Sequence, residues 1–185
     1  MDGTLTVSAH DFEYMRRELG IASNTPILEA LNAMPADQAA PLWELLNEME
    51  FYFASKASVM QGARELLEKL FQRGVQLGIL TRNTLPVVEH TLAACGIAHF
   101  FPRVHIFDRD ACAPKPSPDG INQLLRLWQA SPDDAVMVGD YLFDLQAGKK
   151  AGVTTIHLDQ QGEFAWPDVA DICIRDFAEI EEHVG

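Results

Sequence analysis

Cysteine and basic residues are scarce in this sequence, and both scarcities exclude classes of protein. The three cysteines, Cys95, Cys112 and Cys173, form no CxxC pair. This argues against a disulfide framework or a structural zinc site and fits a reducing compartment. Lysine and arginine total 14 against 27 aspartates and glutamates, a formal net charge of -13. We therefore expect no binding to nucleic acid or to an anionic membrane surface.

Long apolar runs, internal repeats and Gly/Ser-rich linkers are also missing. No stretch approaches the roughly 20 apolar residues of a membrane helix, and the first twenty residues lack the basic and apolar segments of a signal peptide. We therefore expect a soluble, cytoplasmic protein. With 185 residues, of which 48% are hydrophobic, the chain is long enough for one good-sized core and a small additional lobe.

The chain changes character near residue 58. Before this point, the apolar spacing predicts helices over residues 11–19, from residue 26, and over 37–57, with no strand. After it, short apolar runs typical of buried strands alternate with helical stretches. The predicted strands span residues 75–80, 104–107, 135–138, 153–158 and 172–174; the predicted helices span 62–73, 85–94, 118–129, 142–151 and 177–183. This alternation indicates an α/β fold, with helices on both faces of a parallel sheet.

Polar residues follow several of these strands, where ligands of such sheets bind. They are Thr81, Arg82 and Asn83, then Lys115, then Asp140 and Asp144, and Asp2 stands at the chain start. Clustered carboxylates suit a hard cation such as Mg²⁺, whereas a hydroxyl, backbone amides and a lysine suit a phosphate. A carboxylate can also act as the nucleophile in phosphoryl transfer.

Four segments in this order, DGTLT, ILTRN, APKPSP and VGDYLFD, resemble the four motifs of the haloacid dehalogenase (HAD) superfamily. The closest resemblance is to the phosphoglycolate phosphatase-like branch, which has a small helical cap between the first two motifs. The resemblance implies a Rossmann-like core of residues 1–8 and 58–185 and an all-α cap of residues 9–57.

The resemblance also assigns roles to the polar residues. It makes Asp2 the general acid and base and Lys115 the group that neutralises the nucleophile and the phosphoryl oxygens. The implied phosphate-binding residues are Thr81, Arg82, Asn83 and Lys115. The implied Mg²⁺ ligands are Asp2, through its backbone carbonyl, Asp140 and Asp144.

Each residue also has a simpler interpretation. Thr81, or Arg82 and Asn83, could cap the next helix, and Asp140 could do the same further along the chain. Lys115 could be an exposed loop lysine, and Asp144 could lie on a solvated helix face.

One element of the family pattern precedes the given sequence. The family's nucleophile is the first Asp of a DxDGT motif, two positions before the residue matched by Asp2, at the end of a central strand. We expect Met1 to correspond to the middle residue of DxD, with the nucleophilic Asp and the missing central strand encoded upstream. The alternative is a degenerate scaffold without catalysis.

The resemblance implies a Mg²⁺-dependent phosphatase that hydrolyses a small phosphorylated metabolite through an aspartyl-phosphate intermediate. Asp2 favours a phosphate ester over a halo-acid, because only the alcohol leaving group needs a proton. A catalytically inactive scaffold and a phosphomutase are the alternatives. The substrate's identity and the oligomeric state stay open at this point.

Overall fold

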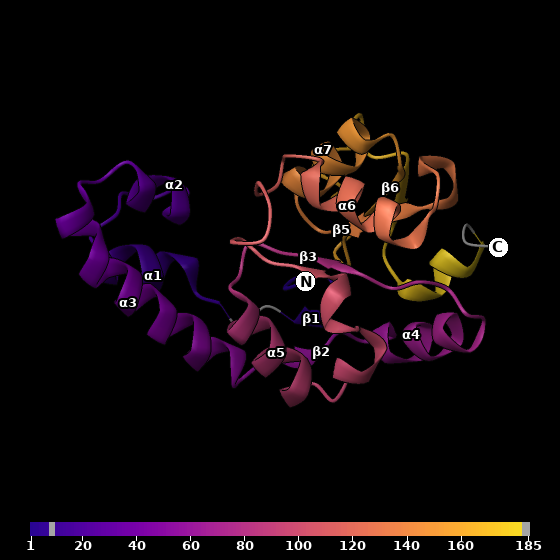
Figure 1. The fold of residues 1–185 in the computed structure, drawn as a ribbon, viewed down its shortest axis with the longest axis horizontal. Coiled ribbons are helices and arrows are strands. Elements are labelled where there is room, and N and C mark those ends of the chain that lie inside the picture. Colours follow the sequence, from indigo (N-terminus) through magenta and orange to yellow (C-terminus); the bar gives the residue numbers. More distant parts are fainter. Residues whose placement is uncertain (8–9, 183–185) are drawn as a thin grey trace.

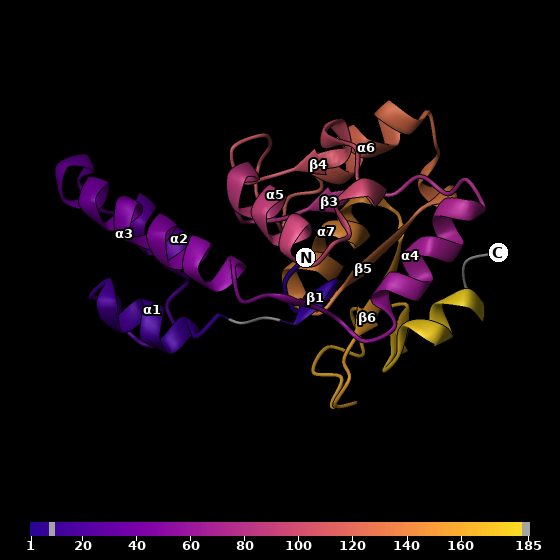
Figure 2. The same ribbon diagram turned by 90° about the horizontal axis from the view of Figure 1, so that it is seen from below.

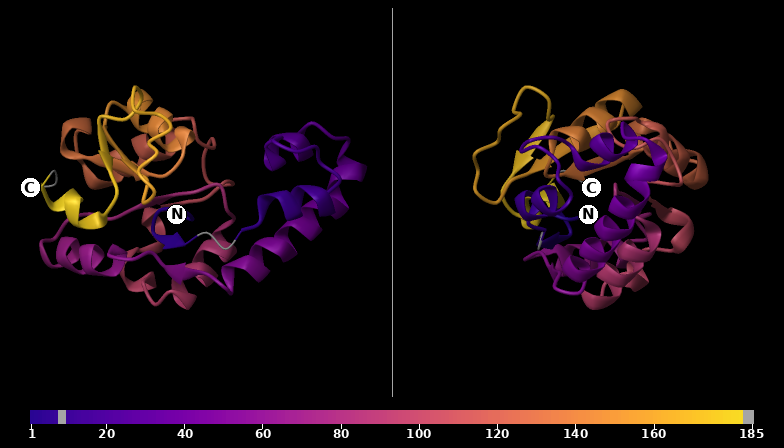
Figure 3. Two further views of the ribbon diagram at one scale, coloured as in Figure 1. Left: turned by 180° about the vertical axis from the view of Figure 1, so that it is seen from behind. Right: turned by 90° about the vertical axis from the view of Figure 1, so that its left-hand side faces the viewer.

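The computed structural model describes residues 1–7 and 10–182. Three helices near the start of the chain stand to one side of the molecule (Figure 1): α1 (Phe12–Glu18), α2 (Ile27–Asn32) and α3 (Ala36–Ala54). Seen from behind, α3 runs from the remainder of the fold to the far end of this helical lobe (Figure 3). We call the lobe the cap. The predicted boundary between residues 8 and 9 lies outside the described residues.

The cap has a hydrophobic core of its own. Helix α1 begins where the Asp11 carboxylate accepts a hydrogen bond from the Tyr14 N–H (2.9 Å), an N-cap that the sequence favours. The apolar faces of the three helices meet in one cluster of buried side chains, formed by Met15, Leu19, Ile21, Ile27, Leu31, Leu46, Met49 and Phe53. The cap is therefore a packed unit that presents one surface to the rest of the fold.

The remaining residues form the predicted α/β core. Strand β3 (Ile79–Leu80) pairs in parallel with β4 (Ile106–Phe107). Strand β5 (Val136–Gly139) pairs in parallel with β6 (Thr154–Leu158), which pairs in parallel with β7 (Ile172–Ile174). The helices between the strands are α4 (Ala63–Gln72), α5 (Leu85–Ala94), α6 (Asp119–Trp128) and α7 (Leu142–Ala151). The α/β fold class predicted from the alternating pattern is confirmed.

Helices cover both faces of the strands, as right-handed crossovers require. On one face, α4 and α5 contribute Leu67, Val88 and Leu92 to a cluster with Ile79 and Ile106. On the other face, side chains from α6 and α7 pack together around β3, among them Ile121, Leu125, Ala147, Ala151 and Leu80. No described helix is long and apolar enough to span a membrane.

The sheet is split into two halves. Among the described residues, β3 pairs only with β4, and β5 pairs on one side only, with β6. A cavity of about 470 Å³ lies between the free edges of β3 and β5. Its lining is mainly apolar and includes Leu67, Ile79, Leu124, Met137 and Val138. A buried strand edge with unpaired backbone groups is costly, and the free edges of both β3 and β5 border this cavity.

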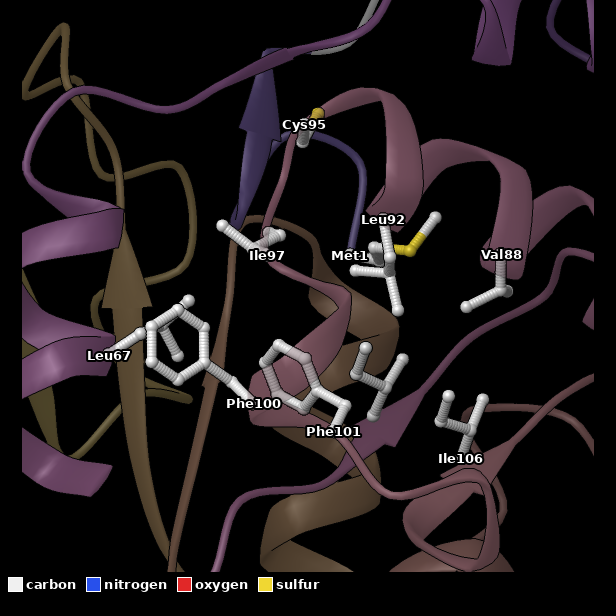
Figure 4. Packing of buried hydrophobic residues seen from close by; sticks show 10 residues of the cluster. Met1, Leu67, Val88, Leu92, Cys95, Ile97, Phe100, Phe101 and Ile106 are labelled. Atoms are coloured by element: carbon white, nitrogen blue, oxygen red, sulfur yellow. The ribbon is translucent and has the colours of Figure 1, made fainter. Parts of the chain in front are cut away.

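The first residue closes one end of this cavity. Met1 is buried, with 9% of its surface exposed, and packs beside Leu92 and Val88 of α5 (Figure 4). Its carbonyl accepts hydrogen bonds from the N–H groups of the next turn, including Leu5 N–H at 2.8 Å. The chain start is therefore tied into the core, between the cavity and the polar residues that follow it.

Several predicted elements differ from the structure. An antiparallel ribbon of β1 (Thr6–Val7) and β2 (Ser58–Val59), which was not predicted, lies where the chain crosses between core and cap (Figure 2). Of the predicted strand 75–80, only Ile79–Leu80 pairs with another strand. The described residues before them, 75–78, border the cavity and have no strand partner. The predicted strand 104–107 begins as a 3₁₀ turn, Arg103–His105, and the predicted last helix is the 3₁₀ segment Phe177–Glu182; residue 183 lies outside the described part.

Candidate active site

The loops after the strands converge on one pocket between the core and the cap. The pocket has a volume of about 570 Å³. All seven site residues predicted from the sequence line it: Asp2, Thr81, Arg82, Asn83, Lys115, Asp140 and Asp144. Residues up to 142 positions apart in the chain therefore meet at the carboxyl ends of the strands, as the fold rule predicts.

Asp2 is held by two side-chain donors. Its Oδ1 accepts a hydrogen bond from the Thr6 hydroxyl (3.1 Å), and its Oδ2 accepts one from the Asn83 amide (2.6 Å). Thr6 is fully buried in β1, so the short β1–β2 ribbon helps to fix this carboxylate. The side-chain amide of Asn83 thus contacts Asp2, and its predicted contact with phosphate stays a prediction.

Asp140 lies against the backbone of the DGT turn. Gly3 has a φ of +79°, and a Cβ at this position would come within 2.1 Å of Asp140 Oδ2, so only glycine permits this approach. The Thr4 hydroxyl donates to Asp140 Oδ1 (2.6 Å), while Oδ2 accepts no hydrogen bond from the described residues. Burial raises the pKa of Asp140, and the hydrogen bond from the Thr4 hydroxyl opposes this.

Asp144 and Lys115 form a buried ion pair beneath the pocket. Lys115 donates to Asp144 Oδ1, and only 9% and 7% of the two side chains are exposed. Asp144 Oδ2 accepts the Tyr141 N–H (3.1 Å) at the first turn of α7. Burial opposes ionisation of Asp144, but the charge and hydrogen bond of Lys115 and the Tyr141 N–H hold its pKa below the usual range. Asp144 therefore positions Lys115.

These contacts exclude several simpler interpretations. Lys115 is buried and is not an exposed loop lysine, and Asp144 is 5% exposed and is not on a solvated face. The N-cap of α5 is Thr84, and that of α7 is Tyr141. Neither Thr81 nor Asp140 is therefore a helix cap.

Thr81 and Arg82 lie side by side but face different partners. Thr81 is buried, and its hydroxyl oxygen accepts the Asn83 N–H (3.2 Å), which leaves the hydroxyl proton available to a ligand. Arg82 reaches the cap, where it pairs with Glu29 of α2, and its guanidinium lies 5.4 Å from the centre of the Phe143 ring. A phosphate contact of Arg82 stays a prediction.

The cap side of the pocket carries polar groups that the sequence did not single out as a site. His10 stacks on Phe12 with ring centroids 5.6 Å apart, and burial lowers its pKa. Glu50 of α3 pairs with Arg109 of the core (2.9 Å), and both side chains are at least 90% buried. Burial raises the pKa of Glu50, and Arg109 opposes this. No spacing rule marks these residues, because cap and core meet only in the folded chain.

The donor set of the pocket suits Mg²⁺ and does not form a closed metal cage. Among residues 1–7 and 10–182, no three His, Cys, Asp or Glu side chains cluster as a metal site. Asp140, with one oxygen not accepting a protein hydrogen bond, and the backbone of Asp2 supply oxygen donors. Mg²⁺ in proteins is usually held by one or two carboxylates, with water and substrate phosphate completing its octahedron. The residues present fit that mode.

Residues 8–158 match the family model described as haloacid dehalogenase-like hydrolase. The chain belongs to this family. The match covers most of the cap and the core through β6, and it confirms the family that the four motifs predicted. Family membership rests on this match along the chain. It agrees with the four motifs, whose site residues line the pocket.

Relatives and solved structures agree with this assignment. A haloacid dehalogenase-like hydrolase domain-containing protein of Arabidopsis thaliana is 31% identical over 180 residues, covering 91% of this chain and 71% of that protein. Validoxylamine A 7'-phosphate phosphatase of Streptomyces hygroscopicus is 26% identical, covering 100% and 95%. A hydrolase from Pseudomonas syringae shares the fold, with a TM-score of 0.79, 22% identity and coverage of 99% and 94%.

Proposed function

We propose that this protein is a Mg²⁺-dependent phosphatase that hydrolyses a small phosphomonoester. The observation that carries the proposal is the meeting of Asp2, Thr81, Lys115 and Asp140 in one pocket roofed by the cap. The similarity to a phosphatase of a phosphorylated metabolite, which extends along the whole chain, supports the same reaction class.

The core residues would hold the phosphate of the ester. The Thr81 hydroxyl would donate to one phosphoryl oxygen, and the Lys115 ammonium, fixed by Asp144, would neutralise others. Asp140 and the Asp2 backbone would hold Mg²⁺, which supplies additional positive charge against the phosphoryl oxygens. Phosphoryl transfer depends mainly on such positioning and neutralisation.

Asp2 would act as the general acid and base. Its carboxyl group would protonate the alkoxide that leaves when the P–O bond breaks, and the resulting carboxylate would then take a proton from the attacking water. Hydrogen bonds from Thr6 and Asn83 fix the carboxylate in the pocket. The cap above it would limit the access of bulk water to the reaction.

The covalent step needs a second carboxylate as the nucleophile. We propose that this group lies two positions before Asp2, at the end of a strand that fills the cavity between β3 and β5. The support is the cavity itself, which has a free strand edge on each side and Met1 at the end facing the pocket. Attack on phosphorus would form an aspartyl phosphate and release the alcohol, and water would then hydrolyse the acyl phosphate.

The state of the three cysteines bears on the cellular location. Cys95, Cys112 and Cys173 are free. Free thiols are usual in a reducing compartment, so we propose a cytoplasmic location.

The test is phosphate release by the protein as its native source produces it. We expect turnover of a phosphomonoester with Mg²⁺ and loss of turnover with excess EDTA. Asp140→Asn should lower kcat at least about a hundredfold through lost charge stabilisation. Asp133→Asn, at an exposed aspartate before β5, is the matched control and should leave the rate unchanged. Absence of turnover with every ester tried would favour the inactive scaffold.

A further inference from the structure

Two backbone hydrogen bonds extend the pairing of β3 and β4 into the loops that follow these strands. Thr81 N–H donates to the Phe107 carbonyl (3.0 Å), and Arg109 N–H donates to the Asn83 carbonyl (3.1 Å). The end of β4 and the loop after it therefore hold two residues of the pocket, Thr81 and Asn83, by their backbones. Between these two contacts lies Asp108, whose side chain has no part in the mechanism proposed above.

Asp108 is a buried carboxylate that ties the two loops together. Only 8% of its surface is exposed, and it is not among the described residues that line the pocket. Its Oδ2 accepts the Leu85 N–H at the start of α5 (2.8 Å), and its Oδ1 accepts the Ala111 N–H of its own loop (2.8 Å). One side chain thus bridges both loops, with a backbone donor on each oxygen.

Helix α5 receives its N-terminal cap from this carboxylate. Thr84, the N-cap residue, makes no side-chain cap hydrogen bond, and Pro86 has no N–H. A carboxylate at a helix N-terminus satisfies a free backbone donor and is favoured by the helix dipole. Asp108 supplies, from 23 positions away, the cap that the residues of the helix do not supply themselves.

Asn83 is the pocket residue on which this bridge acts most. The N–H of Thr81 is bonded directly to β4, so strand pairing fixes that residue. Asn83 lies beyond the pairing and is held by Arg109 of the bridged loop, while its side-chain amide donates to Asp2 Oδ2 (2.6 Å). A shift of the loop would therefore move Asn83 and Asp2 more than it moves Thr81.

The cap fixes the other side of the same loop. The Arg109 guanidinium donates to Glu50 Oε1 (2.9 Å) and lies 5.2 Å from the centre of the Trp43 ring, and both of these residues belong to α3. The loop is thus held by the core through Asp108 and by the cap through Arg109. The position that it imposes on Asn83 is therefore well defined.

We infer that Asp108 is a positioning residue, which acts through the bridged loop and Asn83 to orient the Asp2 carboxyl group for proton transfer. This inference rests on the proposed function and adds to it a residue outside the pocket. Loss of the Asp108 carboxylate should slow the reaction where the leaving group needs a proton, and it should matter little where the leaving group does not. A residue that served stability alone would show no such selectivity.

The test uses the protein as its native source produces it and two esters that differ in their leaving groups. Glycerol 2-phosphate releases an alkoxide that must be protonated, whereas p-nitrophenyl phosphate releases a phenolate that leaves without a proton. Asp108→Asn keeps the shape of the side chain but turns an N–H₂ donor toward one of the two backbone N–H groups. We expect kcat/KM to fall at least about tenfold for glycerol 2-phosphate and less than about threefold for p-nitrophenyl phosphate. Equal losses for the two esters would overturn the inference.

Asp171→Asn is the matched control. Asp171 also accepts a backbone N–H, from Thr155 (2.9 Å), and it does not line the pocket. This variant should leave the ratio of the two kcat/KM values unchanged, even if it unfolds more easily. A change in the ratio as large as that in Asp108→Asn would show that the ratio follows stability, and it would contradict the inference.

A double variant tests the route through Asn83. If Asp108 acts on Asp2 through Asn83, then Asp108→Asn/Asn83→Ala should have the same kcat/KM for glycerol 2-phosphate as Asn83→Ala alone, because both changes remove one and the same contact. Losses that multiply in the double variant would show that Asp108 acts by another route and would overturn the inference.

The same coupling can be measured without turnover. The contact with Asp2 protects the side-chain amide protons of Asn83, so their exchange with water, followed by NMR, should be at least about fivefold faster in Asp108→Asn. It should be unchanged in Asp171→Asn. Unchanged exchange in Asp108→Asn would overturn the inference. An absence of turnover with both esters would count against the proposed function alone, and the exchange rates would still decide the inference.

Discussion

Lys115 donates a hydrogen bond to Asp144 beneath the pocket, and both side chains are buried. Within residues 1–7 and 10–182 neither side chain makes a second ion pair, so the pair is a structural unit as well as part of the site. We expect Lys115→Met to destabilise the fold by about 3–5 kcal/mol, because it leaves the Asp144 carboxylate buried and unpaired. Urea unfolding measures this change.

The double variant Lys115→Met/Asp144→Leu separates stability from function. Replacing a buried ion pair by apolar residues is often nearly neutral for stability, so we expect most of the lost stability to return. Phosphatase activity should stay absent, since the ammonium is gone. Recovery of activity in the double variant would show that Lys115 does not serve the reaction.

Among the described residues, the ion pairs Glu50–Arg109 and Glu29–Arg82 join cap and core; they differ in burial and should differ in energy. Glu50 and Arg109 are both buried, whereas Glu29 is half exposed beside Arg82. Arg109→Met should lower the free energy of unfolding by about 3–5 kcal/mol, because it leaves the buried Glu50 carboxylate without its ion-pair partner. Glu29→Gln should cost less than about 1 kcal/mol, as exposed pairs do. Equal losses of stability in the two variants, measured by thermal or urea unfolding, would contradict the claim that burial makes the Glu50–Arg109 pair the stronger one.

Asn83 is expected to act on catalysis through Asp2. Its amide donates to Asp2 Oδ2 (2.6 Å), and loss of this contact frees the carboxyl group to move. We expect Asn83→Ala to lower kcat about 10- to 100-fold with a smaller change in KM, because misplacement affects the reacting geometry most. Asn32→Ala, at the exposed end of α2, is the control. A change in KM alone would indicate a simple binding role.

The raised pKa of Glu50 links stability to pH. Because the pKa is raised in the folded state, the folded chain binds this proton more tightly than the unfolded chain does. The contribution of Glu50 to stability is therefore present below its unfolded value, near 4.5, and declines as pH rises through the folded pKa.

The variant Glu50→Gln removes this dependence. We expect the stability of the unmodified protein relative to Glu50→Gln to fall as pH rises above the ordinary Glu value of 4.5, measured by urea unfolding at several pH values. Glu48→Gln lies on the same helix at an exposed position and should show no such trend. If this relative stability rose with pH, it would contradict a raised pKa of Glu50 in the folded state.

Much of the fold was predictable because the core helices are bounded by local signals. The predicted helices 85–94 and 142–151 match α5 and α7 at both ends. Strand lengths were less predictable, because hydrogen-bonded pairing requires a neighbouring strand. Residues 75–78 have a strand-like sequence but border the cavity. The β1–β2 ribbon was missed because two-residue strands leave no periodic signal.

The site was predictable in membership but not in contacts. The seven site residues that the motifs named all line the pocket, whereas Met1, Tyr141 and Phe143 line it without having been named. The sequence could not show that Asn83 binds Asp2 or that Arg82 pairs with Glu29 across 53 positions. The cap contribution of His10, Arg16 and Glu50 depends on how two packed units meet, and no local pattern records that.

The central claim is that Asp2 is the proton donor and acceptor of a phosphatase. The most direct measurement is the kcat of phosphate release for Asp2→Asn, in the protein as its native source encodes it, against the unmodified enzyme with Mg²⁺. Asn keeps the acceptor oxygen and cannot transfer the proton, so the account predicts a fall of about 10²- to 10⁴-fold. An Asp2→Asn variant that retains the full rate would contradict it.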